Sequence, residues 1–371
     1  MDAALTLTAS RCAILVVSKH RLMERASMGE VTIIGVDLAK NVFQVHGAAS
    51  DGSVIFRKKL SRPQFARFMA QQRSCLVAME ACASAHYWAR LFEDLGHTVL
   101  LLPPKHVKAY LRGQKNDYND AQAIAEAAYH GALRPVPVKS VIQQDEQAFH
   151  RMRSQCVGER TRVVNQVRGL LAEYGLVIPQ GTTALRKALP RILADAENGL
   201  TPRFRELLDR QYRRLVALDE ELAWFQEQLR QQGRQDEVCQ RLQEIPGFGP
   251  VVASAVKCWM GDGQQFRRGR DASAALGIVP RQFSSGDKDR LLGITKRGDG
   301  YTRAQIINGA RSVVIRAGGK FDALSRWIVR LVETRGFNKA VVALANKLIR
   351  IAWVVIARGE RYQPREALAQ G

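Results

Sequence analysis

Four carboxylates in the first third of the chain lie where they could form one acidic cluster. They are Asp37, Glu80, Asp117 and Asp120. The first follows the apolar run Val31–Val36, and the second follows another apolar run, Cys75–Met79. The last two are three residues apart at the start of a helical stretch, so both can point from one helix face. Acids at the ends of neighbouring strands and on a facing helix can meet at one point.

Such a cluster has a definite chemistry because like charges brought together repel each other. It is stable only if protons or divalent cations hold it together. Two oxygen-ligated Mg²⁺ ions (or Mn²⁺) would neutralise the four acids and hold a scissile phosphate between them. A single Asp at a strand or helix end is more commonly just solvated, but four acids in this order favour the metal site.

A second candidate group surrounds the two serines of Pro280–Gly286 in the C-terminal half. A tight turn there could present the hydroxyl of Ser284 or Ser285. The segment and its surroundings carry many cations, which are Arg281, Lys288, Arg290, Lys296, Arg297 and Arg303. These cations could hold a phosphodiester and stabilise its transition state. A serine could attack phosphorus only with a base or metal to activate it. No base is evident nearby, so composition alone favours an ordinary basic turn.

A glycine-containing turn lies between two apolar helical stretches, at Ile245–Pro250. It is typical of a helix-hairpin-helix element. Gly247 and Gly249 would let the backbone approach a phosphate, and the next helix would offer its free N–H groups. Such contacts position nucleic acid without reading its sequence. A plain turn between helices is the alternative.

The elements that must position these residues can be read from the periodicity. Strands are predicted over 31–36, 42–48, 54–59, 75–79 and 98–102, with helices over 63–72 and 85–95 and another opening at 103–104. This order of three strands followed by alternating helices and strands predicts an α/β layer of the RNase H-like type. Domain one is expected to cover 28–144.

The remaining chain reads as helical. Between 145 and 236 apolar residues such as Leu215, Leu218 and Leu222 recur every three or four positions, which indicates long amphipathic helices. This region is either a coiled-coil arm or a helical linker packed on its own domain. A second compact, all-α domain is expected over 237–359, followed by a tail at 360–371. Residues 1–27 are expected to be a disordered extension or the product of a wrongly assigned start codon.

Composition points to a polyanionic partner. The formal net charge is +21 and the pI is about 10.2. Residues 1–150 hold 18 basic and 13 acidic side chains, a net of +5, which leaves +16 for the rest. Because basic side chains that bind phosphates release counterions, which favours binding, residues 151–371 are expected to be the main nucleic-acid-binding part. The six cysteines contain no CxxC pair, which predicts reduced thiols in a cytoplasm and no zinc site. The apolar stretch 337–356 is interrupted by Lys and Arg and reads as a core helix rather than a membrane span.

Six segments in this order resemble one known family. They are GVDLAKN (35–41), MEACASAHYW (79–88), KNDYNDA (115–121), IPGFGPVVA (245–253), PRQFSSG (280–286) and ITKRGDGYTR (294–303). The chain resembles the insertion-sequence transposases of the one-ten family, the relatives of the Piv DNA invertase, from Met28 to about Arg358.

The resemblance implies a RuvC-like domain whose acids map onto Asp37, Glu80, Asp117 and Asp120. It also implies a C-terminal transposase domain whose nucleophilic serine maps onto Ser285, with Ser284 adjacent. Members of this kind are recombinases guided by a structured RNA from their own element. The resemblance therefore implies element and target DNA, a guide RNA and Mg²⁺ as partners. A serine without a local base makes sense if the acidic site of another domain, in the same protomer or another, completes it, which predicts a dimer or tetramer. The enzyme is expected in the bacterial cytoplasm, associated with the nucleoid.

Three functions follow as expectations. The first is a DNA recombinase that forms a serine–phosphodiester intermediate. The second is a RuvC-like, metal-dependent junction nuclease, in which water attacks and Ser285 only positions the backbone. The third is a protein that binds nucleic acid without catalysis, which the charge suggests but which leaves the four acids unexplained.

Overall fold

The computed structural model describes residues 30–111, 116–131, 133–285 and 288–364. The predicted extension at 1–27, Gly286, and the end of the predicted tail lie outside these residues. The chain divides into two compact units. The first holds the residues up to Ile142 together with 264–267, and the second holds 143–263 and 268 onward.

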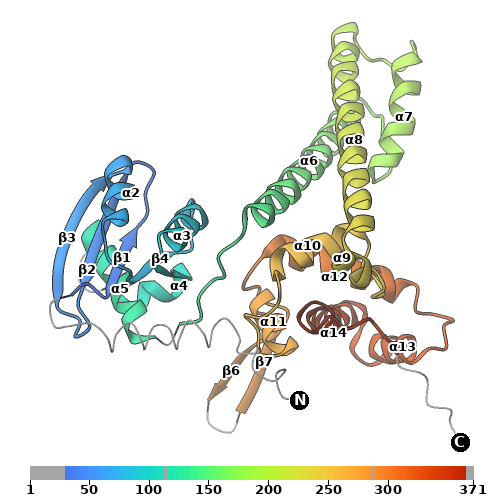
Figure 1. The fold of residues 1–371 in the computed structure, drawn as a ribbon. Coiled ribbons are helices and arrows are strands. Elements are labelled where there is room, and N and C mark those ends of the chain that lie inside the picture. The colour runs from blue at the N-terminus through green and yellow to red at the C-terminus, as the bar shows by residue number, and fades with distance from the viewer. Residues whose placement is uncertain (1–29, 112–115, 132, 286–287, 365–371) are drawn as a thin grey trace, which may run out of the picture. The chain divides into compact units, whose positions relative to one another are not determined.

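The first unit is built on a five-stranded sheet with the strand order β3-β2-β1-β4-β5 (Figure 1). Its strands are β1 Ile33–Asp37, β2 Val42–Ala48, β3 Val54–Ser61, β4 Leu76–Glu80 and β5 Thr98–Leu102. The first three strands pair antiparallel, whereas β4 lies parallel to β1 and β5 lies parallel to β4. The predicted mixed α/β layer is confirmed.

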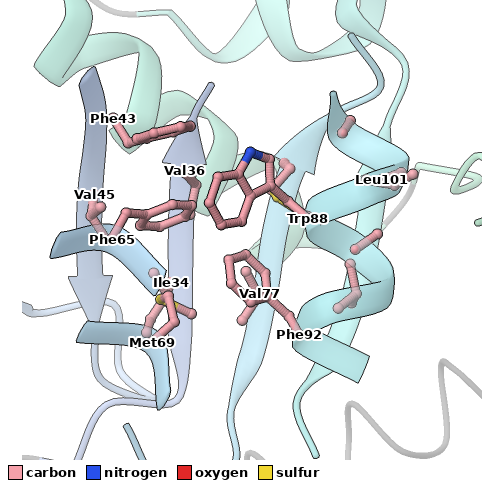
Figure 2. Close-up of a cluster of buried hydrophobic side chains, with 14 of the residues drawn as sticks. Ile34, Val36, Phe43, Val45, Phe65, Met69, Val77, Trp88, Phe92 and Leu101 are labelled. Carbon is pink, nitrogen blue, oxygen red and sulfur yellow. The ribbon is translucent and has the colours of Figure 1, made fainter. Parts of the chain in front are cut away.

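One face of the sheet is covered by α2 (Arg62–Ala70) and α3 (Ala85–Asp94). The start of α2 is fixed locally, because the backbone N–H of Ser61 donates to Oε1 of Gln64 at 2.9 Å. Figure 2 shows the core between this face and its helices. The ring of Phe65 stacks on Phe43 at 4.5 Å and meets Trp88 edge-on at 4.8 Å between centroids. Burial of these large rings holds the sheet against its helices.

The other face of the sheet is covered by α5 (Asp117–His130), which is reached through α4 (Pro104–Val107) and the 3₁₀ turn η1 (Lys108–Tyr110). Gly35 of β1 makes this contact close. A Cβ atom at that position would lie 2.3 Å from the carbonyl oxygen of Ala121 and 2.7 Å from the nitrogen of Ala125. Glycine therefore lets the backbone of α5 rest directly on β1.

Three helices form the first part of the second unit: α6 (Val141–Ala172), α7 (Thr182–Ala194) and α8 (Pro202–Gln235). They share a core of their own, to which α6 contributes Val167 and α8 contributes Leu218. Asp219 ties the three helices together, since Arg160 and Arg186 bind its two carboxylate oxygens at 3.1 and 2.6 Å. The predicted long amphipathic helices are present, packed on one another.

The second part of this unit is helical apart from one hairpin. Its helices are α9 Glu237–Gln243, α10 Pro250–Met260, α11 Gly269–Leu276, α12 Gly300–Ile315, α13 Ala323–Arg335 and α14 Phe337–Arg358. The hairpin consists of β6 Pro280–Ser285 and β7 Lys288–Ile294, a segment whose sequence suggests a loop. Among the described helices, α14 is long and apolar enough to cross a membrane, but half of its most apolar stretch is buried inside the protein. It packs on α11, α12 and α13 as a core helix.

A buried polar group joins the two parts of this unit. His150 of α6 is 4% exposed, and its Nε2 lies 2.9 Å from the hydroxyl of Ser254 on α10. Its Nδ1 lies 3.0 Å from the hydroxyl of Tyr301 on α12. Burial, reinforced by the charge of Arg153, lowers the pKa of His150 to about 4. The imidazole is therefore neutral at pH 7 and links three helices without a buried charge.

Candidate active site and nucleic-acid surface

Asp37 and Glu80 end two neighbouring parallel strands. The register pairs Val36 of β1 with Met79 of β4, so the two acids are the next residues along each strand. Adjacent strands are separated by about 4.8 Å, which places the two backbones side by side. Both residues are half-buried. The predicted meeting of acids from the ends of neighbouring strands is therefore what the register produces for this pair.

The two acids also point to the same face. Val36 and Met79 belong to the core under α2 and α3. Because successive side chains in a strand alternate, Asp37 and Glu80 must point to the opposite face, which is the face that α5 covers. Alternation in both strands thus brings the carboxylates out beside α5.

Asp117 and Asp120 lie in the first turn of that helix, as predicted. The helix begins after Asn116, whose side-chain oxygen accepts a hydrogen bond from the N–H of Asn119 at 2.8 Å. Such a cap fixes the first turn. Asp120 is half-buried and directly precedes Ala121, whose carbonyl group contacts Gly35. The side chain of Asp117 lies outside the described residues.

The described part of the chain contains no group of three His, Cys, Asp or Glu side chains close enough to hold a metal ion. The structure therefore brings Asp37 and Glu80 together and puts Asp120 on the facing helix, while a complete four-acid site stays a prediction. Two carboxylates on one face are hard oxygen donors, which are the ligands that Mg²⁺ and Mn²⁺ take. The donor set thus fits a divalent cation.

The negative charges of Asp37 and Glu80 affect the pKa of Cys82, two residues beyond the end of β4. The pKa of Cys82 is raised, first by burial of its thiol and then by the charges of Glu80 and Asp37. The N–H of Cys82 bonds to the carbonyl oxygen of Glu80 at 2.8 Å. Ser84, the residue before α3 in the same loop, has a φ of 66°, a conformation rare outside glycine. The edge of the sheet is thus electronegative and bordered by a constrained turn.

The candidate nucleophile lies in the second unit, whereas the acids lie in the first. Ser285 is the last residue of β6, and its backbone pairs with Lys288 at the start of β7. The side chains of these two residues lie outside the described part. Ser284 is exposed, and its hydroxyl accepts a hydrogen bond from Nε2 of Gln282 at 2.9 Å. The two serines expected in a tight turn therefore lie at the end of strand β6, and the residues that join β6 to β7 lie outside the described part.

The predicted phosphate-binding cations differ in their surroundings. Arg281, Arg290, Lys296 and Arg297 are exposed, and the side chain of Lys288 lies outside the described residues. Arg303 is half-buried, and its guanidinium donates to the carbonyl oxygens of Leu276 and Arg297 at 3.0 and 2.7 Å. Arg303 thus ties α12 to the end of α11. The four exposed cations are the ones that a phosphate can reach from solvent.

The predicted hairpin between helices is present between α9 and α10. Gly249 caps α10 and has open space around its Cβ position. Gly247 has a φ of 85°, and a Cβ there would lie 2.7 Å from the carbonyl oxygen of Gly309 on α12. Close packing on α12 requires glycine at position 247, whereas Gly249 is exposed with open space around its Cβ position.

One basic surface is not evident from the sequence. An open pocket of about 1390 Å³ lies beside α11, α13 and α14. Its cations come from three separate segments and are Arg268, Arg270, Lys320, Lys347, Arg350 and Arg361, against the acids Asp322 and Glu360. Nζ of Lys347 sits 4.7 Å from the ring centroid of Trp327, which also lines the pocket. A cationic pocket with an aromatic wall suits a nucleic-acid strand.

Comparison with known proteins agrees with this geometry. A transposase model of the IS110 DEDD type matches residues 34–176, and a model described as the IS116/IS110/IS902 transposase family matches 239–326. The chain is 43% identical over 353 residues to the transposase for insertion sequence element IS1111A of Coxiella burnetii, covering 94% of this chain and 97% of that protein. It is 47% identical over 332 residues to a probable family 20 transposase of Pseudomonas aeruginosa, covering 89% and 98%. It is also 37% identical to the transposase for element IS1328 of Yersinia enterocolitica, covering 90% and 98%.

Proposed function

The chain belongs to the IS116/IS110/IS902 family of transposases, and we propose that it cuts and rejoins the DNA of its insertion sequence through a serine–phosphodiester intermediate. A transposase is a DNA-processing enzyme and binds DNA. The observation that carries the proposal is the pairing of Asp37 with Glu80 on the sheet face that α5 covers. A phosphoryl-transfer enzyme needs such oxygen donors where the scissile phosphate is held.

A DEDD transposase domain implies a divalent metal site. Asp37 and Glu80 would hold the cation, together with Asp120 and Asp117 from α5. When bound, the cation supplies positive charge that stabilises the transition state and lowers the pKa of a coordinated hydroxyl group. The protein's own part is to fix these oxygens on a sheet and a helix that pack backbone to backbone at Gly35.

Ser285 is the proposed nucleophile. Its hydroxyl oxygen would bond to phosphorus while the bond from phosphorus to a deoxyribose oxygen breaks. The serine proton passes to solvent, and the leaving oxygen gains a proton. A deoxyribose hydroxyl of the strand to be joined later displaces the serine. Each step exchanges one phosphate ester for another, so rejoining needs no ATP.

The nucleic acid would be held by the second unit. The exposed Arg281, Lys296 and Arg297 flank the serine hairpin, and the pocket beside α14 adds a further basic surface. The high positive charge of the chain beyond residue 150 supports the same assignment. We propose that these surfaces bind the element DNA and a guide RNA transcribed from the same element. The enzyme would act as a dimer or tetramer, with α6 and α8 as candidate contacts.

The test is a search for a covalent adduct between the protein and DNA. The full chain is expressed with its flanking element DNA as wild type, Ser285→Ala, Ser284→Ala and Asp37→Ala. We expect a protease-sensitive adduct in the wild type and in Ser284→Ala, and none in the other two variants. Ser284→Ala is the matched control, because it removes a neighbouring hydroxyl from the same strand.

The same experiment decides the competing function. Cleaved DNA with no adduct in any version would replace the recombinase by a metal-dependent junction nuclease in which water attacks. DNA binding without cleavage in the wild type would instead leave a protein that only binds nucleic acid.

A further inference from the structure

We propose that Gln44 is a further member of the acidic site and contributes its amide oxygen to the coordination shell of the divalent cation, directly or through one bound water. The inference rests on the proposed metal site at Asp37 and Glu80. It adds to the four acids an uncharged residue, which lies between Asp37 and Glu80 in the sequence.

The sheet register places Gln44 beside the acids. β2 pairs antiparallel with β1, and Gln44 is the direct partner of Asp37. Directly opposite residues in antiparallel strands point to the same face, with Cβ atoms about 5 Å apart. Because Glu80 follows Asp37 on the next strand, the row across β2, β1 and β4 reads Gln44, Asp37, Glu80.

The neighbours of Gln44 in β2 confirm its direction. Phe43 and Val45 both belong to the core under α2 and α3. Gln44 lies between them and therefore points to the opposite face, toward α5. All three oxygen-bearing side chains of the row thus share the face of the sheet that α5 covers.

The amide oxygen of Gln44 has no partner among the described residues. The side chain is only 4% exposed, yet its Oε1 accepts no hydrogen bond. A buried polar oxygen of this kind is normally satisfied, because leaving it without a partner costs free energy. A cation, or a water bound to one, would satisfy it.

The chemistry of an amide suits this position. Amide oxygens are established ligands for hard cations. A third carboxylate in the row would be repelled by both Asp37 and Glu80, whereas a neutral oxygen completes a coordination shell without adding charge. Residues that complete or orient a coordination shell change metal affinity by about 10- to 100-fold when they are replaced.

The test measures binding of Mn²⁺ to the full chain by electron paramagnetic resonance, without nucleic acid. It compares the wild type with Gln44→Leu, Gln44→Glu and Asp37→Asn. Gln72→Leu is the matched control, because Gln72 is a partly buried glutamine of the same unit whose amide donates to the carbonyl oxygen of Phe68. Thermal unfolding of each variant without metal shows whether it is folded.

We expect Gln44→Leu to weaken Mn²⁺ binding about tenfold or more while it unfolds at or above the wild-type temperature. Gln44→Glu, which keeps an oxygen, should bind Mn²⁺ at least as tightly as the wild type, and Gln72→Leu should bind it as the wild type does. Wild-type affinity in Gln44→Leu, with binding lost in Asp37→Asn, would overturn the role of Gln44 and leave the metal site standing. Undiminished binding in Asp37→Asn would overturn the proposed metal site and this inference together.

Discussion

The Cβ position of Gly247 lies 2.7 Å from the carbonyl oxygen of Gly309, and that of Gly309 lies 2.3 Å from the carbonyl oxygen of Gly247. The hairpin between α9 and α10 thus touches α12 backbone to backbone. Real Cβ atoms do not approach backbone oxygens this closely, so neither position has room for a side chain. The glycine whose place in the turn suggests a phosphate contact is a packing residue.

Gly247→Ala should therefore destabilise the second unit. The new methyl group would clash with α12, and the φ of 85° is strained for any residue with a Cβ. Together these effects should cost about 2–4 kcal/mol in free energy of unfolding. Gly249→Ala is the control, because its Cβ position is open and its φ is −80°. Urea unfolding of the three proteins checks the expectation, and equal stability for both variants would contradict it.

Asp37→Asn should abolish catalysis without loss of the fold. Removing one of two neighbouring like charges relieves repulsion, so the metal-free variant should be at least as stable as the wild type. Mg²⁺ at ten times its Kd should stabilise the wild type by about 1.4 kcal/mol and the variant hardly at all. DNA cleavage should fall about a hundredfold or more. Thermal unfolding with and without Mg²⁺, and cleavage assays, test both parts. A variant that still cleaves DNA at the wild-type rate would exclude Asp37 from the site.

His150 should make the stability of the second unit depend on pH. Its pKa in the folded protein is about 4, below the usual 6.5, so the unfolded chain binds a proton more readily. Stability contributed by the neutral imidazole is then fully present above about pH 6.5 and is lost as the pH falls toward 4, by up to about 3 kcal/mol.

Urea unfolding between pH 7.5 and 4.5 measures this loss. The loss of unfolding free energy over this range should be smaller in His150→Gln than in the wild type. His86 of the first unit has its pKa lowered to about 4 as well, so His86→Gln serves as the comparison and should leave the response of the second unit unchanged. The same pH dependence in wild type and His150→Gln would show that His150 is not its source.

The basic pocket should contribute to the grip on nucleic acid. Arg270 and Arg350 line it, are exposed, and form no ion pair with any described residue. Replacing both by Ala should weaken binding of single-stranded DNA and RNA. It should also reduce the slope of log K against log salt by about 0.7 for each phosphate that the protein no longer neutralises.

Arg330→Ala is the control for this effect, because Arg330 is exposed on α13 but does not line the pocket. Fluorescence anisotropy between 50 and 300 mM salt gives both quantities. An unchanged slope of log K against log salt in the double variant would show that nucleic acid binds elsewhere. A loss of binding confined to RNA or to DNA would identify which strand the pocket prefers.

The acids at Asp37 and Glu80 could be predicted because the apolar runs before them are unmistakable. A buried parallel strand reads as a continuous apolar segment, so the residue after it marks the sheet edge. The start of α5 could be predicted only as the beginning of a helical stretch at Asp117 and Asp120, and the structure adds the cap by Asn116. Periodicity therefore located these acids, and strand pairing brought two of them together.

Gln44 could not be recognised in the same way. In β2 it stands between the apolar Phe43 and Val45, and such alternation normally indicates a strand with one face in solvent. Gln44 is buried because α5 covers that face, and the local sequence of β2 does not indicate that a helix lies there. The pocket cations could not be predicted for a related reason, because they come from distant parts of the chain: Arg270 from α11, Lys320 from the connection between α12 and α13, and Arg350 from α14.

The β6–β7 hairpin could not be predicted because its strands are short and rich in polar residues. Phe283 is 70% exposed, so the strand carries no inward apolar pattern to read. Backbone pairing between β6 and β7 defines the structure there.

The contacts of His150 give the long helices a mechanical role. At about 1.5 Å per residue, the 34 residues of α8 extend about 50 Å, and α6 runs beside it over a shared core. At the base of this pair, His150 is bonded to α10 and α12, the helices that flank the Gly247–Gly309 contact. Because these bonds tie α6 to α10 and α12, a tilt of the paired helices α6 and α8 would move α10 and α12 with it. A displacement at the far end of α8 would thereby reach the turn between α9 and α10.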